Sequence, residues 1–128
     1  MHAKAKRARV MLVAANPETA RELRAYLADA GVGVDAIRLP PNATDLPPDL
    51  SAVVLFPDDY EEAAIAARVA ALRAARPGLL VLLVTSAPQR LGAATSPDGD
   101  TRPPLVLPKP AFGWSILDAI RAHEEEPE

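Results

Sequence analysis

The chain has 128 residues, of which 49 % are hydrophobic and 24 % charged, and its formal net charge is −3. This is the size and composition of one ordinary domain with a substantial core, and the negative charge argues against a nucleic-acid-binding surface for the domain as a whole. There is no cysteine, and both histidines, His2 and His123, lie near an end of the chain, so a disulfide framework is excluded and a zinc or histidine-based catalytic site is not expected.

No apolar run approaches the roughly 18 residues of a membrane span, and no secretory signal precedes the first apolar run. We therefore expect a cytoplasmic protein of bacterial type that makes no membrane contact. Residues 1–8 are basic and are expected to form a solvated N-terminal extension. An arm that binds nucleic acid or acidic lipid is the alternative for this extension.

The first predicted strand is the apolar run Val10–Ala14. Asn16 and Pro17 then suit the N-cap and the first turn of a helix. Apolar residues follow at helical spacing on one face, and Gly31 ends the helix. These apolar residues are Ala20, Leu23, Leu27 and Ala30.

A second strand is predicted over Val32–Ile37, at an edge of the sheet because glycine and aspartate interrupt it. Residues 38–50 contain Pro40, Pro41, Pro47 and Pro48. Proline lacks a backbone N–H and disfavours helix in the residue before it. A proline-rich loop is therefore expected where a helix would otherwise connect two strands.

The central strand is predicted over Ala52–Phe56, because an unbroken apolar run with β-branched residues is typical of a strand that is buried on both faces. Pro57 should end it. Asp58 or Asp59 is expected to cap the next helix, over residues 59–76, with Glu62 completing a capping box.

Another buried strand is predicted over Leu79–Val84, with Thr85 at its carboxyl end. Residues 87–104 are poorly organised, with at most one or two helical turns before a loop. A short strand over Leu105–Pro108 and a last helix over residues 113–124 complete the chain. The acidic residues 124–128 are expected to be a tail or the start of a linker.

Strands and helices alternate, and the inner strands are continuous apolar runs, which predicts a parallel sheet with helices on both faces. Five strands in this length suit a doubly wound, flavodoxin-like α/β domain over residues 9–123, with strand order 2-1-3-4-5. In this arrangement the second helix is replaced by the proline-rich loop, and the fourth helix is short or degenerate.

Three segments resemble the response-regulator receiver (CheY-like) family over about residues 8–123. The first is the strand at residues 9–13 followed by Asn16, Pro17 and Glu18. The second is the strand that ends at Thr85, which resembles the switch position of the family. The third is the lysine–proline pair Lys109 and Pro110.

The chain departs from this family at its phosphorylation site. Ala14 and Ala15 stand where the family has acidic residues that hold magnesium, and Phe56 stands at the phosphoacceptor position. Val106 replaces the aromatic switch residue. A magnesium site needs oxygen ligands, and phosphoryl transfer depends on the metal. The resemblance therefore implies an atypical receiver, a pseudo-receiver, without Mg²⁺, cofactor or enzymatic activity.

The function that follows is a phosphorylation-independent signalling module that binds protein partners or a second copy of itself. One alternative is a phosphorylated receiver that uses a displaced acceptor, Asp58 or Asp59. Another is a small-molecule sensor domain, although no glycine-rich loop follows a strand to hold a nucleotide.

Two partner-binding surfaces are expected. One is the sheet face between residues 38–50 and 86–104, which we expect to be thinly covered and to present Arg90 and Leu91. The alternative for this face is that the two loops fold over the sheet and seal it. The other surrounds Phe112 and Trp114, because tryptophan is favoured where proteins bind one another. Packing of these two aromatic side chains over the rim of the sheet is the alternative.

Overall fold

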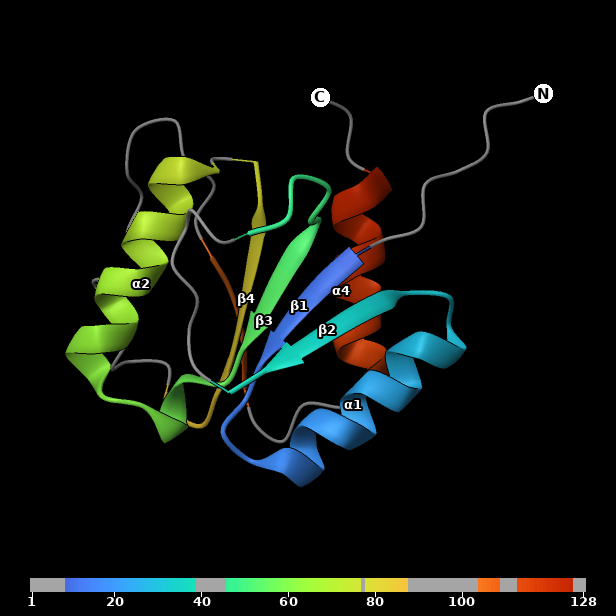
Figure 1. The fold of residues 1–128 in the computed structure, drawn as a ribbon, viewed down its shortest axis with the longest axis horizontal. Helices are drawn as coiled ribbons and strands as arrows, with labels where there is room; N and C mark the ends of the chain where they lie inside the picture. The colour runs from blue at the N-terminus through green and yellow to red at the C-terminus, as the bar shows by residue number, and fades with distance from the viewer. Residues whose placement is uncertain (1–8, 39–45, 77, 88–103, 109–112, 126–128) are drawn as a thin grey trace.

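The computed structural model describes residues 9–38, 46–76, 78–87, 104–108 and 113–125 (Figure 1). Its strands pair in parallel in the order β2-β1-β3-β4-β5, which confirms the predicted flavodoxin-like topology. The strands are β1 (Arg9–Val13), β2 (Gly33–Ile37), β3 (Ala52–Leu55), β4 (Leu80–Thr85) and β5 (Leu105–Pro108); the helices are α1 (Pro17–Asp29), α2 (Glu62–Ala75) and α4 (Gly113–Glu125).

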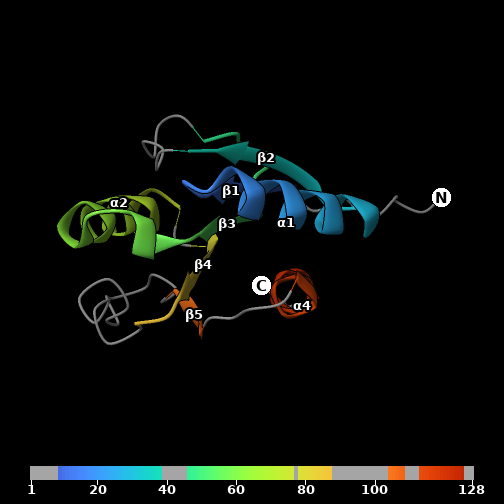
Figure 2. The same cartoon turned by 90° about the horizontal axis from the view of Figure 1, so that it is seen from below.

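The helices cover both faces of the sheet. Helices α1 and α4 lie on one face and α2 lies on the other (Figure 2). Strand β2 is an edge strand, as predicted. Most of the proline-rich segment, residues 39–45, and the predicted degenerate fourth helix within 88–103 lie outside the described residues. No helix in the described part of the chain is long and apolar enough to cross a bilayer.

Alternating side chains of β1, β3 and β4 build two cores, one on each face of the sheet. The core under α1 and α4 contains Val10, Leu12, Ala14, Val54, Phe56, Leu82, Ile116 and Ile120, among others. The core under α2 contains Met11, Val13, Val53, Leu55, Ile65, Val69 and Leu83, among others. Successive residues of each continuous apolar run therefore point alternately into the two cores.

Helix α1 begins as the sequence predicts. The Asn16 side chain accepts hydrogen bonds from the backbone N–H groups of Glu18 (2.8 Å) and Thr19 (3.4 Å), and Pro17 is the first helical residue. Gly31 follows the helix with φ of 89°. Glycine adopts such a left-handed conformation without steric cost, so the chain reverses there into β2.

The predicted capping box at the start of the next helix is wrong. Residues Pro57–Asp59 form a single 3-10 turn, and α2 begins only at Glu62. Its N-cap is Glu61, whose side chain makes no capping hydrogen bond. Tyr60 is extended between the turn and the helix, so Asp59 and Glu62 do not belong to the same first helical turn.

The sheet face under α2 is well covered, contrary to expectation. The six apolar residues that β1, β3 and β4 contribute to the core on this face are all buried. Leu46 and Leu50, from the end of the proline-rich segment, pack into the same core. The Arg76 guanidinium donates a hydrogen bond to the Leu46 carbonyl (3.1 Å). The two leucines and the hydrogen bond therefore help to cover the sheet face that a helix after β2 would otherwise cover.

Arg9 joins two segments at the amino ends of the strands. Its guanidinium pairs with Asp35 on β2 (3.0 Å) and with Asp49 before β3 (2.9 Å). The hydrogen bond to Asp35, together with the charge of Asp49, raises the pKa of Arg9. All three groups are well exposed, so solvent screens the attraction and its main effect is on geometry.

Gly113, the first residue of α4, lies against the Tyr26 ring of α1. A Cβ atom at this position would lie 2.9 Å from two ring carbons of Tyr26. We predict that Gly113→Ala lowers the free energy of unfolding by about 1 kcal/mol, because overpacking outweighs the better helix propensity of alanine. Chemical denaturation measures this change.

Gly78→Ala is the matched control, because a Cβ there meets nothing within 4 Å. In a Tyr26→Ala background, Gly113→Ala should become neutral or stabilising. A loss of stability that is the same in both backgrounds would show that the Tyr26 ring is not the cause.

Candidate functional site

The carboxyl edge of the sheet brings Ala14 and Phe56 together. The Phe56 N–H donates to the Val13 carbonyl (3.1 Å), and the Ala14 N–H donates to the Ile37 carbonyl (3.1 Å). These bonds continue the ladders β3–β1 and β1–β2 by one residue beyond each strand. The edge position that a ligand or reactive group would occupy in an open α/β sheet is therefore fixed by backbone pairing.

The side chains at this position are apolar and buried. Phe56 is 8 % exposed and Ala14 is 2 % exposed, and both belong to the core under α1 and α4. Ala15, the next predicted position, is exposed and does not join them. Burying a phenylalanine side chain contributes about 1.5–3 kcal/mol to stability. The end of the central strand thus extends the core and presents no carboxylate.

A carboxylate does lie nearby, two residues further along the chain. Asp58 accepts hydrogen bonds from the Thr85 hydroxyl and from the Ser86 backbone N–H (2.9 Å) and hydroxyl (3.0 Å). Thr85 and Ser86 lie at the carboxyl end of β4, next to β3 in the sheet. The Asp58 side chain therefore connects the ends of two neighbouring strands.

Thr85 is held on two sides. Its hydroxyl donates to Asp58 and accepts a hydrogen bond from the Ala87 N–H (3.0 Å), and the residue is 1 % exposed. A buried hydroxyl needs such partners because an unpaired one is costly. The rotamer of this hydroxyl is thus determined by groups of the same chain.

Sequence reasoning missed this cluster, which we call the Asp58–Thr85–Ser86 cluster. It treated Asp58 as a helix cap or a displaced phosphoacceptor and Thr85 as a switch-like position, and it did not connect the two. The usable signal was positional, because Asp58 follows one strand and Thr85 ends the next, and parallel neighbours end at the same edge of a sheet.

The structure describes only some of the other predicted site residues. Lys109, Pro110, Phe112, Arg90 and Leu91 lie outside the described residues. Trp114 is 56 % exposed at the start of α4. Val106 of β5 is half-buried against the core under α2. Within the described part of the chain, no group of three or more histidine or acidic residues is placed to hold a metal ion.

Several solved structures that are similar to this fold are receiver domains. A receiver domain protein (CheY-like) from Methanospirillum hungatei JF-1 has a TM-score of 0.71 at 13 % identity, covering 95 % of this chain and 100 % of that chain. A receiver protein from Sinorhizobium medicae WSM419 has a TM-score of 0.70 at 16 % identity, covering 92 % and 94 %. The non-phosphorylated HemR receiver domain from Leptospira biflexa has a TM-score of 0.67 at 20 % identity, covering 95 % and 98 %.

No protein-family model and no curated protein matches this sequence. At such low identities the structural likeness establishes the fold. The fold that the resemblance implied is therefore confirmed, and what the chain does depends on the residues at its own edge.

The bond between Asp58 and Thr85 predicts an energetic coupling between them. We expect Asp58→Ala and Thr85→Val each to lower the free energy of unfolding, with a coupling energy of about 1–2 kcal/mol, because the second substitution removes a bond that the first has already broken. Chemical denaturation of the two single variants and the double variant measures it. Asp118→Ala, an exposed aspartate on α4, is the control and should be additive with Thr85→Val; additivity of the Asp58 pair would contradict the prediction.

Proposed function

We propose that this chain is a phosphorylation-independent signalling module, a pseudo-receiver that acts by binding protein partners or a second copy of itself. The observation that carries this proposal is Phe56. It occupies the position at which the resembling family carries its phosphoacceptor, and it is buried against α1 and α4. A buried aromatic ring supplies neither a nucleophilic oxygen nor a metal ligand.

The rival function, phosphorylation of a displaced acceptor, is disfavoured at Asp58. Both carboxylate oxygens of Asp58 already accept hydrogen bonds, from Thr85 and from Ser86. Attack on a phosphorus atom would require one of these oxygens to leave its donors. Phosphoryl transfer also depends on cations that neutralise the developing charge, and no cluster of three acidic or histidine residues within the described ranges offers a metal site.

Asp58 also supports a function that needs no phosphoryl group. In the resembling family, Thr85 occupies the switch position. In this chain its hydroxyl donates to a carboxylate of the same molecule. The Asp58 carboxylate of the same chain therefore orients the Thr85 side chain. A module of this kind presents the same surface without being phosphorylated.

Trp114 supports a protein partner. It is the most exposed of the large hydrophobic residues in the described ranges, at 56 %, and Tyr26 of α1 is 41 % exposed. Tyr26 packs against Gly113, the residue before Trp114, so both aromatic residues lie at the contact between α1 and α4. Exposed tryptophan and tyrosine are typical of the residues that carry binding energy in protein interfaces.

Phosphorylation with a small phosphodonor tests the first half of this proposal. We expect no phosphoryl adduct by intact mass after incubation with acetyl phosphate and Mg²⁺, because neither Phe56 nor the engaged Asp58 provides an acceptor. A receiver with an intact acidic site is the positive control. A stoichiometric adduct that disappears in Asp58→Asn or Asp59→Asn would establish the rival function.

Self-association tests the second half. We expect sedimentation velocity to show concentration-dependent association that Trp114→Ala weakens about ten-fold, since truncating an interface tryptophan commonly costs more than 1 kcal/mol. The double variant Arg90→Asp, Leu91→Asp probes the alternative surface. Association that Trp114→Ala leaves unchanged and the double variant abolishes would move the contact to residues 86–104.

A further inference from the structure

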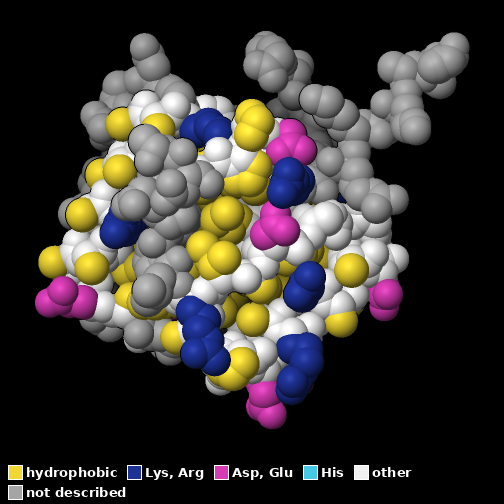
Figure 3. Space-filling view, viewed as in Figure 1, with side chains coloured by type: hydrophobic (Ala, Val, Ile, Leu, Met, Phe, Trp, Pro, Cys, Tyr) yellow, Lys and Arg dark blue, Asp and Glu magenta, His cyan; other side chains and the backbone are white. Residues whose placement is uncertain are grey.

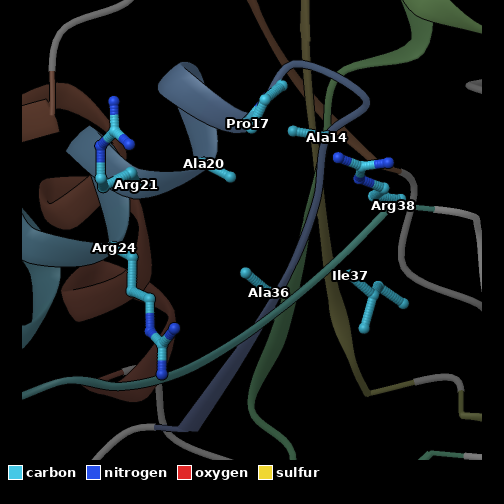
Figure 4. A pocket seen from close by; sticks show the side chains of 8 residues that line it. All are labelled: Ala14, Pro17, Ala20, Arg21, Arg24, Ala36, Ile37 and Arg38. Carbon is cyan, nitrogen blue, oxygen red and sulfur yellow. The ribbon is translucent and has the colours of Figure 1, made fainter.

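A cavity of about 440 Å³ opens between α1 and the carboxyl end of β2. It lies beside the edge position of Phe56, on the side of β1 away from β3. Its volume falls within the range of small-molecule pockets in proteins. Its lining residues are Ala14, Pro17, Ala20, Arg21, Arg24, Ala36, Ile37 and Arg38 (Figure 4).

The lining divides into an apolar floor and a basic rim. The floor consists of the small or apolar residues Ala14, Pro17, Ala20, Ala36 and Ile37. Arg21 and Arg24 come from α1, and Arg38 comes from the end of β2 on the other side of the floor (Figure 4). Basic side chains also border hydrophobic atoms on this face in the space-filling view (Figure 3). The site therefore combines apolar contact area with positive charge on two sides of it, although the Arg21 and Arg24 guanidinium groups point away from each other (Figure 4).

The three arginines carry charge that the described residues do not neutralise. None of them forms an ion pair with a carboxylate in the described part of the chain. Arg9, at the opposite end of the strands, pairs with two aspartates. Three positive charges on one cavity, in a chain whose net charge is −3, create a local field that attracts anions.

The backbone around the cavity is held in place. Asn16 caps the first turn of α1, which carries Pro17 and positions Ala20 and Arg21. The Tyr60 hydroxyl donates to the Arg38 carbonyl, which fixes the end of β2 against the turn that follows β3. A pocket on such a scaffold loses little conformational entropy when a ligand binds.

We propose that this cavity binds a small organic dianion, a phosphate monoester or a dicarboxylate, whose apolar body lies on the floor. The planar guanidinium group recognises phosphate and carboxylate through paired hydrogen bonds, and three of them suit a ligand with two negative charges. The alanines leave the volume in which the apolar body sits. This binding is separate from the proposed protein–protein function and does not require it.

A titration of ¹⁵N-labelled protein at constant ionic strength tests the proposal. The probes are phenyl phosphate, phthalate, inorganic phosphate, benzyl alcohol and hexaglutamate. We expect saturable shifts of the Ala14, Ala20 and Ala36 amide signals with phenyl phosphate or phthalate, and whichever binds more tightly identifies the ligand class. Inorganic phosphate should bind more weakly, because it has no apolar body.

Three variants locate the binding. Arg24→Ala should weaken binding about ten-fold, as expected for the loss of a charge-assisted pair. Ala36→Val adds volume to the floor with a residue that suits a strand, keeps all three arginines, and should also weaken binding. Arg68→Ala, which removes one positive charge from α2, should change the affinity less than two-fold. Dispersed spectra of all three variants establish that they are folded.

Four outcomes would overturn the proposal. The first is the absence of saturable shifts at the three alanines with either dianion. The second is an equal response to benzyl alcohol, which would indicate a merely apolar pocket. The third is binding of hexaglutamate alone, which would indicate a surface for acidic peptides. The fourth is an equal loss of affinity in Arg68→Ala, which would indicate general attraction of anions by the whole surface.

Discussion

The parallel pairing of β1 with β3 is the constraint on which the rest of the structure depends. Both strands lie inside the sheet and are buried on both faces, so their backbone polar groups must be satisfied by the ladder. Their register pairs Val13 with Leu55, and this places Ala14 and Phe56 next to each other at the carboxyl edge. Because the register fixes these positions, their residue types decide the chemistry of the edge. An alanine and a phenylalanine make it a continuation of the core.

A carboxylate at this edge, Asp58, lies two residues beyond Phe56. Pro57 starts a tight turn after β3, and the turn carries Asp58 towards β4. A half-buried carboxylate loses part of its hydration, and hydrogen bonds that favour its charged form offset this loss. Thr85 and Ser86 provide three such bonds. These bonds also occupy the carboxylate oxygens that Asp58 would need to act as a nucleophile. The geometry of Asp58 therefore favours a structural role, in which it connects the ends of β3 and β4.

The fold could be predicted because its signals are local and repeated. Ala52–Phe56 and Leu79–Val84 are apolar runs long enough for buried strands, and Asn16 with Pro17 marks the start of α1. The capping prediction failed because Asp59 and Glu62 match a short-range pattern, whereas the turn at Pro57 and the long-range partners of Asp58 decide the local geometry. The cavity had no signal in the sequence. Arg21 and Arg24 are typical solvated residues of a helix, and only the packing of α1 beside β2 brings them opposite Arg38.

The two ends of the strands differ in how their charges are balanced. At the amino ends, Arg9 is matched by Asp35 and Asp49. At the carboxyl edge, Asp58 is satisfied by hydroxyl and amide donors, and the arginines of the cavity have no carboxylate partner among the described residues. Ala14 belongs both to the cavity wall and to the core that contains Phe56. An anion held at the cavity would therefore contact the first strand next to the position at which the resembling family carries a covalent phosphoryl group. Ala14 and Phe56 supply no carboxylate at this edge, and the arginines that line the neighbouring cavity attract negative charge there.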